Sequence, residues 1–452
     1  MSFEQDLKNT ITANLERNLA ELNTLCAQPS ISAQNSGMTE CAELVRRMLA
    51  ARGFTTRILP GEGHPVVFAE RGGRSPQTLL FYNHYDVQPP EPLDLWETPP
   101  FEPSRRDGKL FARGASDDKG HILCRLAAID AFLELEGDLP CRVKFLIEGE
   151  EEIGSVHLPD IIQEHKDLLA ADACLWEFGG VDQEDIPVQV AGLRGILYVE
   201  LSVRTANRDA HSGLGGSIFP NAAWRLTWAL NSLKGPDEHI RLPGFYDAVV
   251  QPSPTDLELL AALPDPAATY LREYALPGFL KGLTGGDNLK REEIFSPTCT
   301  ICGLTSGYQG PGSKTVLPAS ARAKVDFRLV PEQDPDEVLS SLRKHLDAEG
   351  FDDVDIKPLG YNKPARTNLQ DPFLRMVVET ARNVYGQPQR LVPMSGGSGP
   401  NYPFLHLLNI PVATAGIGYP GSQVHAPNEN IRIDDFVRGA QHTALIMDVF
   451  CE

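Results

Sequence analysis

Five short clusters of histidine and acidic residues each follow an apolar run of the sequence. They are His84-Tyr85-Asp86, Asp117-Asp118, Glu150-Glu151-Glu152, Glu177 and His425. Imidazole nitrogens and carboxylate oxygens are the ligands that zinc-like metals take. The clusters hold more carboxylates than one metal needs, so one carboxylate can bridge two ions and another can act as a base. This pattern predicts a hydrolase with two metal ions in its active site.

Taken singly, each cluster also has a structural explanation. His84 and Asp86 could form a pair at the end of a strand, and either aspartate of Asp117-Asp118 could cap a helix. The run Glu150-Glu151-Glu152 could be a solvated acidic loop. One aspartate could bridge metals while the other caps, so both roles remain open. Together, however, the clusters lie where open α/β sheets bind ligands, at the carboxyl ends of strands.

The first part of the chain alternates between helical patterns and short apolar runs. Apolar residues at helical spacing predict helices at 3–25, 41–51, 120–135 and 158–163. Short apolar runs predict strands at 78–82, 142–147 and 173–176. This alternation is typical of an α/β sheet with helices on both faces.

The pattern changes at about residue 196. Apolar and polar residues alternate at 197–203 and 321–328, which predicts strands with one solvated face, and helices are expected at 221–233 and 336–349. A Pro/Gly-rich stretch covers 235–285. A helix at 372–385, a strand at 410–415 and a helix at 436–450 return to the first pattern. We therefore predict a catalytic domain of residues 1–195 and 366–452, with a smaller α+β domain inserted at 196–365.

Four segments of the sequence occur in the order and spacing of one family's motifs. They are residues 83–89, 114–120, 148–155 and 424–429. With them the chain resembles the co-catalytic zinc aminoacylase/carboxypeptidase family over nearly its whole length. Within that family, it is most similar to the branch of carnosinase-like cytosolic dipeptidases. The resemblance implies a three-layer, zinc-peptidase-like α/β catalytic domain. It also implies that the inserted domain is a lid and dimerisation domain.

The resemblance implies a set of metal ligands. His84, Asp117 and Glu177 would bind one zinc-like ion, and Asp117 would bridge to a second ion. Glu152 and His425 would help to hold that second ion. Two divalent ions are therefore expected as cofactors, with zinc as first choice and manganese or cobalt as alternatives.

The same resemblance implies the catalytic roles. Asp86 would orient His84, and Glu151 would be the general base that moves a proton from the water shared by the metals to the leaving amine. A cis peptide bond between Asp117 and Asp118 is also implied.

The inserted domain and the following loop carry the substrate-binding candidates. His211 resembles a lid histidine that donates to the tetrahedral oxyanion, from the partner subunit in dimeric members, and Arg328 resembles an arginine that clamps a substrate carboxylate. Thr315 could add a hydroxyl nearby, while Gly397 and Ser398 belong to a glycine-rich loop whose N–H groups could receive a carboxylate.

These candidates have alternatives that the sequence leaves open. His211 could be a turn residue that caps the helix near Asn221, Arg328 could be a surface-paired strand residue, and the loop could be a connector. Met394-Ser395 stands where the dipeptidases tend to carry an Arg-Glu pair. This departure leaves the recognition of a free substrate amine open.

Composition narrows the function classes. The 452-residue chain has a formal net charge of -20, which argues against nucleic acid or an anionic membrane as partner. The first residues lack a basic region followed by an apolar one, so we expect no secretion signal, and the eight scattered cysteines fit a reducing cytoplasm. Cys299 and Cys302 have C-x-x-C spacing without a second pair, so we interpret them as structural. No G-x-S-x-G or H-E-x-x-H motif is present.

We therefore predict a cytoplasmic di-metal amide hydrolase that cleaves dipeptides or small peptides. An alternative enzyme with the same metals would cleave N-acyl- or N-carbamoyl-amino acids. A binding or scaffold protein with a degenerate hydrolase fold is the alternative from a different class. We also expect a homodimer that forms through the inserted domain.

Overall fold

The structure, a computed structural model, describes residues 2–451 of the chain. These residues form two compact units. The first comprises the chain up to Ala191, Arg366–Pro393 and the chain from Pro400, and the second comprises Gly192–Ala365 and Met394–Gly399. The predicted division at residues 195 and 365, and the role of the inserted domain as a lid, remain predictions. No helix within residues 2–451 is both long and apolar enough to cross a bilayer.

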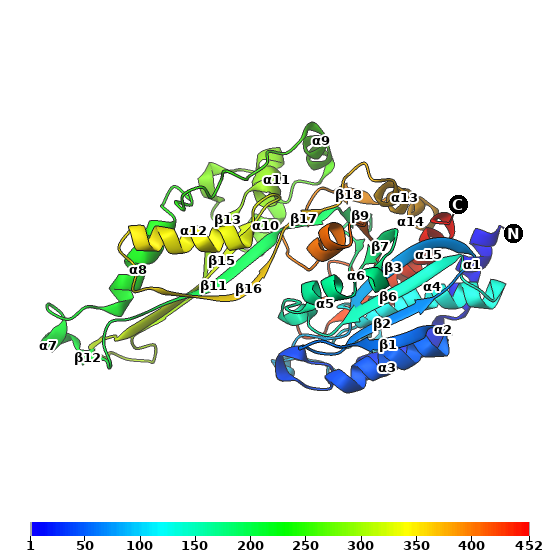
Figure 1. The fold of residues 1–452 in the computed structure, drawn as a ribbon, viewed down its shortest axis with the longest axis horizontal. Helices are drawn as coiled ribbons and strands as arrows, with labels where there is room; N and C mark the ends of the chain where they lie inside the picture. The colour runs from blue at the N-terminus through cyan, green and yellow to red at the C-terminus, as the bar shows by residue number, and fades with distance from the viewer. Residues whose placement is uncertain (1, 452) are drawn as a thin grey trace. The chain divides into compact units, whose positions relative to one another are not determined.

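A six-stranded sheet with strand order β1-β2-β6-β3-β7-β19 forms the centre of the first unit (Figure 1). Its strands are β1 (Thr55–Leu59), β2 (Val66–Arg71), β3 (Ser75–His84), β6 (Cys141–Glu148), β7 (Ala173–Trp176) and β19 (Val412–Thr414). β3 runs parallel to β6 and β7, and β7 runs parallel to β19. Every residue of β3 from Thr78 to His84 is buried, as the apolar run predicted for a strand covered on both faces. The predicted α/β fold class is confirmed.

Helices pack against this sheet and against one another. They are α1 (Phe3–Ala13), α2 (Leu15–Ala27), α3 (Met38–Ala51), α4 (Lys119–Glu136), α5 (Leu158–Glu164), α6 (Lys166–Leu169), α13 (Pro372–Thr380), α14 (Arg382–Tyr385) and α15 (Ile433–Val449), with short helices η1 (Ser32–Gln34), η2 (Leu93–Leu95), η3 (Glu151–Ile153) and η5 (Pro403–Leu407). α4 packs on α1, α2, α15 and β3, whereas α3 packs on β1 and β2. The single helix predicted over 3–25 is wrong, because one helix ends at Ala13 and, after Asn14, a second one begins at Leu15.

Shorter strands complete the first unit. β4 (Ser104–Arg106), β5 (Lys109–Phe111) and β20 (Asn430–Arg432) form one small sheet, and β8 (Gly180–Val181), β9 (Pro187–Val190) and β18 (Arg390–Val392) form another. The antiparallel pairing of β20 with β5 brings the segment after His425 alongside the segment before Asp117. Asp117 and His425, the predicted metal ligands next to these two segments, are 308 residues apart in the sequence.

A four-stranded antiparallel sheet with strand order β13-β15-β11-β16 forms the second unit. Its strands are β11 (Gly195–Arg204), β13 (Thr298–Ser306), β15 (Ser320–Leu329) and β16 (Asp355–Asn362). Four short strands are β10 (Gly192–Leu193), β12 (Ala210–His211), β14 (Val316–Leu317) and β17 (Ala365–Arg366), and the division between the two units falls within β17. Alternate residues of β11, from Leu197 to Val203, are buried in one core with α8 and α12. The predicted alternation is therefore confirmed.

The helices of the second unit include four α-helices, α7, α9, α10 and α11, that the sequence did not predict. The helices are α7 (Ser212–Gly215), α8 (Ala222–Leu233), α9 (Pro254–Ala262), α10 (Ala267–Glu273), α11 (Gly286–Phe295) and α12 (Pro335–Ala348), with η4 (Leu280–Gly282). α8 and α12 match the predicted helices. The Pro/Gly-rich stretch at 235–285 holds α9, α10 and η4, and α11 follows it directly (Figure 1).

Candidate metal centre

The carboxyl ends of three neighbouring strands bring the predicted ligands to one edge of the sheet. His84 ends β3, η3 with Glu151 and Glu152 follows β6, and Glu177 directly follows β7. β3 lies between β6 and β7 and runs parallel to both, so their carboxyl ends share an edge. Asp117 precedes α4 at the same edge, and its carboxylate lies 3.0 Å from the His84 ring. The sequence prediction that these clusters share one rim is confirmed by these distances.

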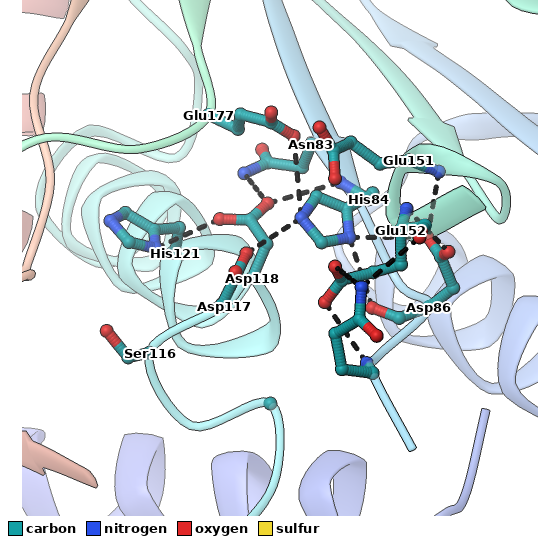
Figure 2. Close-up of polar contacts among 12 residues, drawn as sticks. Asn83, His84, Asp86, Ser116, Asp117, Asp118, His121, Glu151, Glu152 and Glu177 are labelled. Carbon is teal, nitrogen blue, oxygen red and sulfur yellow. Dashed lines mark hydrogen bonds and ion pairs between the residues drawn. The ribbon is translucent and has the colours of Figure 1, made fainter. Parts of the chain in front are cut away.

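Asp117 lies between the two histidines. Its Oδ1 is 3.0 Å from His84 Nε2, and its Oδ2 is 3.0 Å from His425 Nε2. His84 Nε2 is also 3.6 Å from Glu177 Oε2, and His425 Nε2 is 3.0 Å from Glu152 Oε2. Figure 2 shows the His84 ring surrounded by the carboxylates at this edge. One carboxylate thus joins two groups of potential metal ligands.

Two groups of side chains have ligand atoms close enough to hold a metal ion. Within each group these atoms lie within 4.8 Å of one another. One group consists of Asp117, Glu152 and His425, and the other consists of His84, Asp118 and Glu177. The second group contains Asp118 where the sequence analysis assigned Asp117.

The environment of the Glu177 carboxylate is suited to a bound cation. Glu177 is buried, and its Oε2 has no hydrogen-bond partner among residues 2–451. Burial, together with the nearby Glu151 carboxylate, raises the pKa of Glu177 well above its usual value despite the opposing effect of His84. A buried carboxylate oxygen without a donor is costly, and a divalent cation would satisfy it. The residues present therefore fit a metal ion.

The charges at this edge also shift the pKa values of the histidines. Burial alone would lower the pKa of His84, but the carboxylates of Glu177 and Asp117 raise it well above its usual value. Hydrogen bonds with Asp117 and Glu152 raise the pKa of His425 to about 10. Without a cation both imidazoles are stabilised in the protonated form, so a metal ion has to displace these protons. Metal binding should therefore release protons.

Asp86 connects the first histidine with the glutamate turn. Its carboxylate lies 3.2 Å from His84 Nδ1, so the opposite ring nitrogen faces Asp117. The same carboxylate accepts hydrogen bonds from the backbone N–H groups of Glu151 at 3.3 Å and of Glu152 at 3.0 Å. Burial and the nearby Asp117 and Glu152 carboxylates raise the pKa of Glu151 well above its usual value, although His84 opposes this. Asp86 thus contacts both the His84 ring and the backbone of the Glu151–Glu152 turn.

The Asp118 side chain does not cap helix α4, which was one of the alternatives for Asp117-Asp118. It precedes α4, but its side chain makes no capping hydrogen bond. Instead, Oδ2 accepts from Asn83 Nδ2 at 2.7 Å and from the backbone N–H of His84 at 3.1 Å, while Oδ1 lies 2.9 Å from His121 Nδ1. The peptide bond between Asp117 and Asp118 is cis, as the resemblance implied.

Glu429 is a structural component that the sequence analysis did not assign. Its fully buried carboxylate accepts from Arg113 Nη1 at 2.8 Å and from the N–H of Gly114 at 3.0 Å. It also accepts from the N–H groups of Ser116 and Asp117, each at 2.9 Å. Glu429 therefore holds the turn that presents Asp117. The sequence placed it in a motif, but only the fold shows its four donors.

We expect the Glu429→Gln protein to bind zinc about 10–100-fold more weakly than the wild type, because residues that orient a ligand have effects of this size. An amide loses the charge that pairs with Arg113 and offers only one acceptor oxygen to the turn. Zinc affinity would be measured by competition with a coloured chelator. Glu97→Gln is the control, since the Glu97 side chain is exposed, pairs with Arg106 and makes no contact that the structure shows with the predicted metal ligands. Equal zinc affinity in the Glu429→Gln and wild-type proteins would contradict this role.

The second unit brings its candidate residues together in pairs. Thr315 Oγ1 lies 3.3 Å from His211 Nε2, and Arg328 Nη1 donates to Ser398 Oγ at 2.9 Å. His211 Nδ1 accepts from the N–H of Gly213, so it caps the short helix α7. The alternative that His211 caps the helix near Asn221 is wrong, because Asn221 caps α8 with its own side chain. The N–H of Gly397 donates to Ser395 Oγ at 3.2 Å.

The sheet and its carboxylate–imidazole edge define a metal-dependent hydrolase. Residues 80–448 match the model of peptidase family M20/M25/M40. The chain belongs to this family and is a metallopeptidase, so the scaffold alternative is not supported.

Several relatives and solved structures are similar to the chain. It is 30% identical to the Beta-Ala-His dipeptidase of Homo sapiens over 403 residues, which cover 83% of this chain and 76% of that protein. It is 29% identical to the Cys-Gly metallodipeptidase of Schizosaccharomyces pombe, over 83% and 80% of the two chains. An M20 family metallo-carboxypeptidase from Sulfolobus solfataricus superimposes with a TM-score of 0.92 at 35% identity, covering 96% of this chain and 99% of that one. Human carnosine dipeptidase 1 has a TM-score of 0.82 at 26% identity, covering 99% and 100%.

Proposed function

We propose that this protein hydrolyses the peptide bond of dipeptides or small peptides with two divalent cations. The observation that carries the proposal is the position of Asp117, which directs one carboxylate oxygen to each of two histidines. The similarity to enzymes named as dipeptidases and as a metallo-carboxypeptidase supports a small peptide as the substrate.

His84, Asp117 and Glu177 are the proposed ligands of one ion, and Asp117, Glu152 and His425 are those of the other. Asp118 is a weaker candidate, because both of its oxygens already have partners in Asn83, His121 and the His84 backbone. Imidazole and carboxylate ligands favour zinc, with manganese or cobalt as alternatives.

When bound, the two cations would supply Lewis acidity that polarises an amide carbonyl and lowers the pKa of water. Glu151 is the proposed general base, which accepts a proton from the attacking water and donates it to the leaving amine. Its backbone is fixed by Asp86, the residue that also orients His84. Glu152, the next residue, has its carboxylate held by the N–H and the side-chain amide of Gln88. These contacts support a fixed geometry for both glutamates.

The substrate contacts proposed for the second unit rest on sequence motifs and side-chain chemistry. Arg328 can pair with a substrate carboxylate in a bidentate arrangement, and Ser398 and Gly397 belong to the loop beside it. His211 and Thr315 can donate to an oxyanion. Whether His211 acts on its own subunit or on the partner subunit is part of the proposed dimer.

Hydrolysis of an N-acyl- or N-carbamoyl-amino acid is the second candidate function. It is favoured by Met394, which is buried, and Ser395, because neither offers a charge that would pair with a free substrate amine. Values of kcat/KM for a panel of free dipeptides and their N-acetyl and N-carbamoyl counterparts would separate the two functions. We expect the dipeptides to be at least about tenfold better substrates, a difference of about 1.4 kcal/mol in transition-state stabilisation. A preference for the acylated compounds would contradict the peptidase proposal.

A homodimer through the second unit is also proposed. Large hydrophobic side chains are exposed on α7, the segment between α7 and α8, α8 and β13, and they include Leu214, Ile218, Trp224, Trp228, Ile301 and Leu304. β13 is in addition an edge strand of its sheet. Exposed apolar surface of this kind is typical of protein interfaces. Sedimentation of the protein as a monomer at micromolar concentration would contradict the dimer. A cytoplasmic location remains a proposal that the buried free thiols of Cys41, Cys124 and Cys174 support.

A further inference from the structure

We propose that the second unit binds a small amphipathic carboxylate in a cavity beside the Arg194 guanidinium group. The cavity has a volume of about 590 Å³ and lies among α10, η4, α11 and the first residues of β13. This volume is within the range of sites for small organic ligands. The proposed metal ligands, Arg328 and Ser398 do not line the cavity. The proposal therefore does not depend on the peptidase reaction.

Arg194 is a buried cation with few partners. Its side chain lines the cavity, and the residue is only 5% exposed. Nε donates to the carbonyl oxygen of Ile294 at a long 3.4 Å, and Nη2 has no hydrogen-bond partner among residues 2–451. Burial of a guanidinium is costly, and here it lowers the pKa of Arg194 to about 10, although the nearby Glu293 and Glu292 carboxylates oppose this. An anion that enters the cavity would remove this cost.

The acidic side chains beside Arg194 are paired with other residues. Glu293 accepts a hydrogen bond from the Tyr270 hydroxyl at 2.6 Å, and Glu292 forms an ion pair with Lys281. The other lysine of the cavity wall, Lys234, pairs with Glu238 at 2.6 Å. Among the described residues, Arg194 is therefore the cation of this cavity without an ion pair, although Glu293 and Glu292 lie close enough to oppose the lowering of its pKa.

The rest of the wall is largely apolar. Leu289 and Ile240 are buried parts of it, and large side chains such as Tyr274, Leu276 and Leu280 are substantially exposed around it. Exposed leucine and tyrosine side chains beside a buried guanidinium suit a ligand with an apolar body and a single anionic end. A carboxylate matches the planar guanidinium in size and geometry. One guanidinium without an ion pair, in a wall that also carries Glu292 and Glu293, favours such a monoanion over a dianionic phosphate.

Calorimetric titration of the metal-loaded protein with 4-phenylbutyrate tests this site. We expect saturable binding of 4-phenylbutyrate and at least tenfold weaker binding of its amide, 4-phenylbutyramide, because the amide cannot pair with the guanidinium. Inorganic phosphate should also bind at least tenfold more weakly. The Arg194→Gln protein should bind 4-phenylbutyrate at least tenfold more weakly than the wild type.

A second variant keeps the test valid if Arg194→Gln does not fold. Leu280 is 64% exposed, so Leu280→Asp should fold and should weaken 4-phenylbutyrate binding at least fivefold by placing a like charge at the cavity. Glu332→Gln, an exposed change that does not line the cavity, is the control and should bind as the wild type does. Unchanged binding in Leu280→Asp would overturn the proposal, because the carboxylate would then bind elsewhere, including at the metals. Absence of 4-phenylbutyrate binding to the wild type would overturn it as well.

Discussion

The Glu151→Gln protein is expected to lose about 10²–10⁴-fold in kcat for a dipeptide substrate, the range that a general acid–base residue contributes. Glutamine keeps the shape of the side chain but cannot accept a proton at neutral pH. The proposed metal ligands His84, Asp117 and Glu152 remain, so metal content should stay at the wild-type level. Steady-state kinetics and elemental analysis on the same preparation measure both effects.

The neighbouring Glu150 provides a matched control for Glu151. Glu150 pairs with His157 at 2.7 Å and accepts from the His64 N–H, so its carboxylate has a structural role outside the metal centre. Glu150→Gln should therefore reduce kcat far less than Glu151→Gln does. Activity within a few fold of the wild type in Glu151→Gln would show that another group moves the proton.

The Asp117→Asn protein is expected to lose both cations, because Asp117 directs an oxygen to each of the two ligand groups. Saturating zinc at about 1,000 times Kd should stabilise the wild type by about 4 kcal/mol, since a ligand that binds only the folded state shifts unfolding by mass action. Asp117→Asn should lose most of this stabilisation together with its activity. Thermal unfolding with and without zinc, combined with zinc analysis, measures the effect.

Asp118→Asn distinguishes the two possible ligand assignments. Asp118 accepts hydrogen bonds from Asn83 and the His84 backbone and lies 2.9 Å from His121, so its replacement should disturb His84, while the ion proposed at Asp117, Glu152 and His425 should remain. We expect at least one bound zinc per chain in Asp118→Asn. Loss of both ions in Asp118→Asn, with retention of one in Asp117→Asn, would reverse the assignment of the bridging residue.

Much of the first unit could be predicted from the sequence, because its central strands are short, continuous apolar runs. The apolar run that ends at His84 became a fully buried strand, and the acidic residues after β6 and β7 lie at the same edge. In an open sheet with parallel neighbours, a strand's end determines where the following polar residues lie. Residue type and position were therefore sufficient to find the histidines and carboxylates of the site.

The helices of the Pro/Gly-rich stretch were missed because proline was taken as a sign of loops. Pro254 occupies the first turn of α9, where its missing N–H costs nothing, and Ser253 forms a capping box with Asp256. Pro266 directly precedes α10. The signal for these helix starts was present in the sequence. The division at Asn14 had no such signal, because apolar spacing continues across it.

The supporting residues of the site could not be predicted, since their partners are distant in sequence. Glu429 contacts N–H groups more than 300 residues earlier, and Asp118 bonds to Asn83 from another element. A motif shows that such residues are polar, but it does not show which donors the fold brings to them. The choice between Asp117 and Asp118 depends on these contacts.

Anomalous diffraction from zinc-loaded crystals tests the central claim most directly. We predict two zinc peaks per chain, one beside His84 and Glu177 and one beside Glu152 and His425, with Asp117 between them. A single peak, or peaks away from these residues, would contradict a di-metal centre bridged by Asp117.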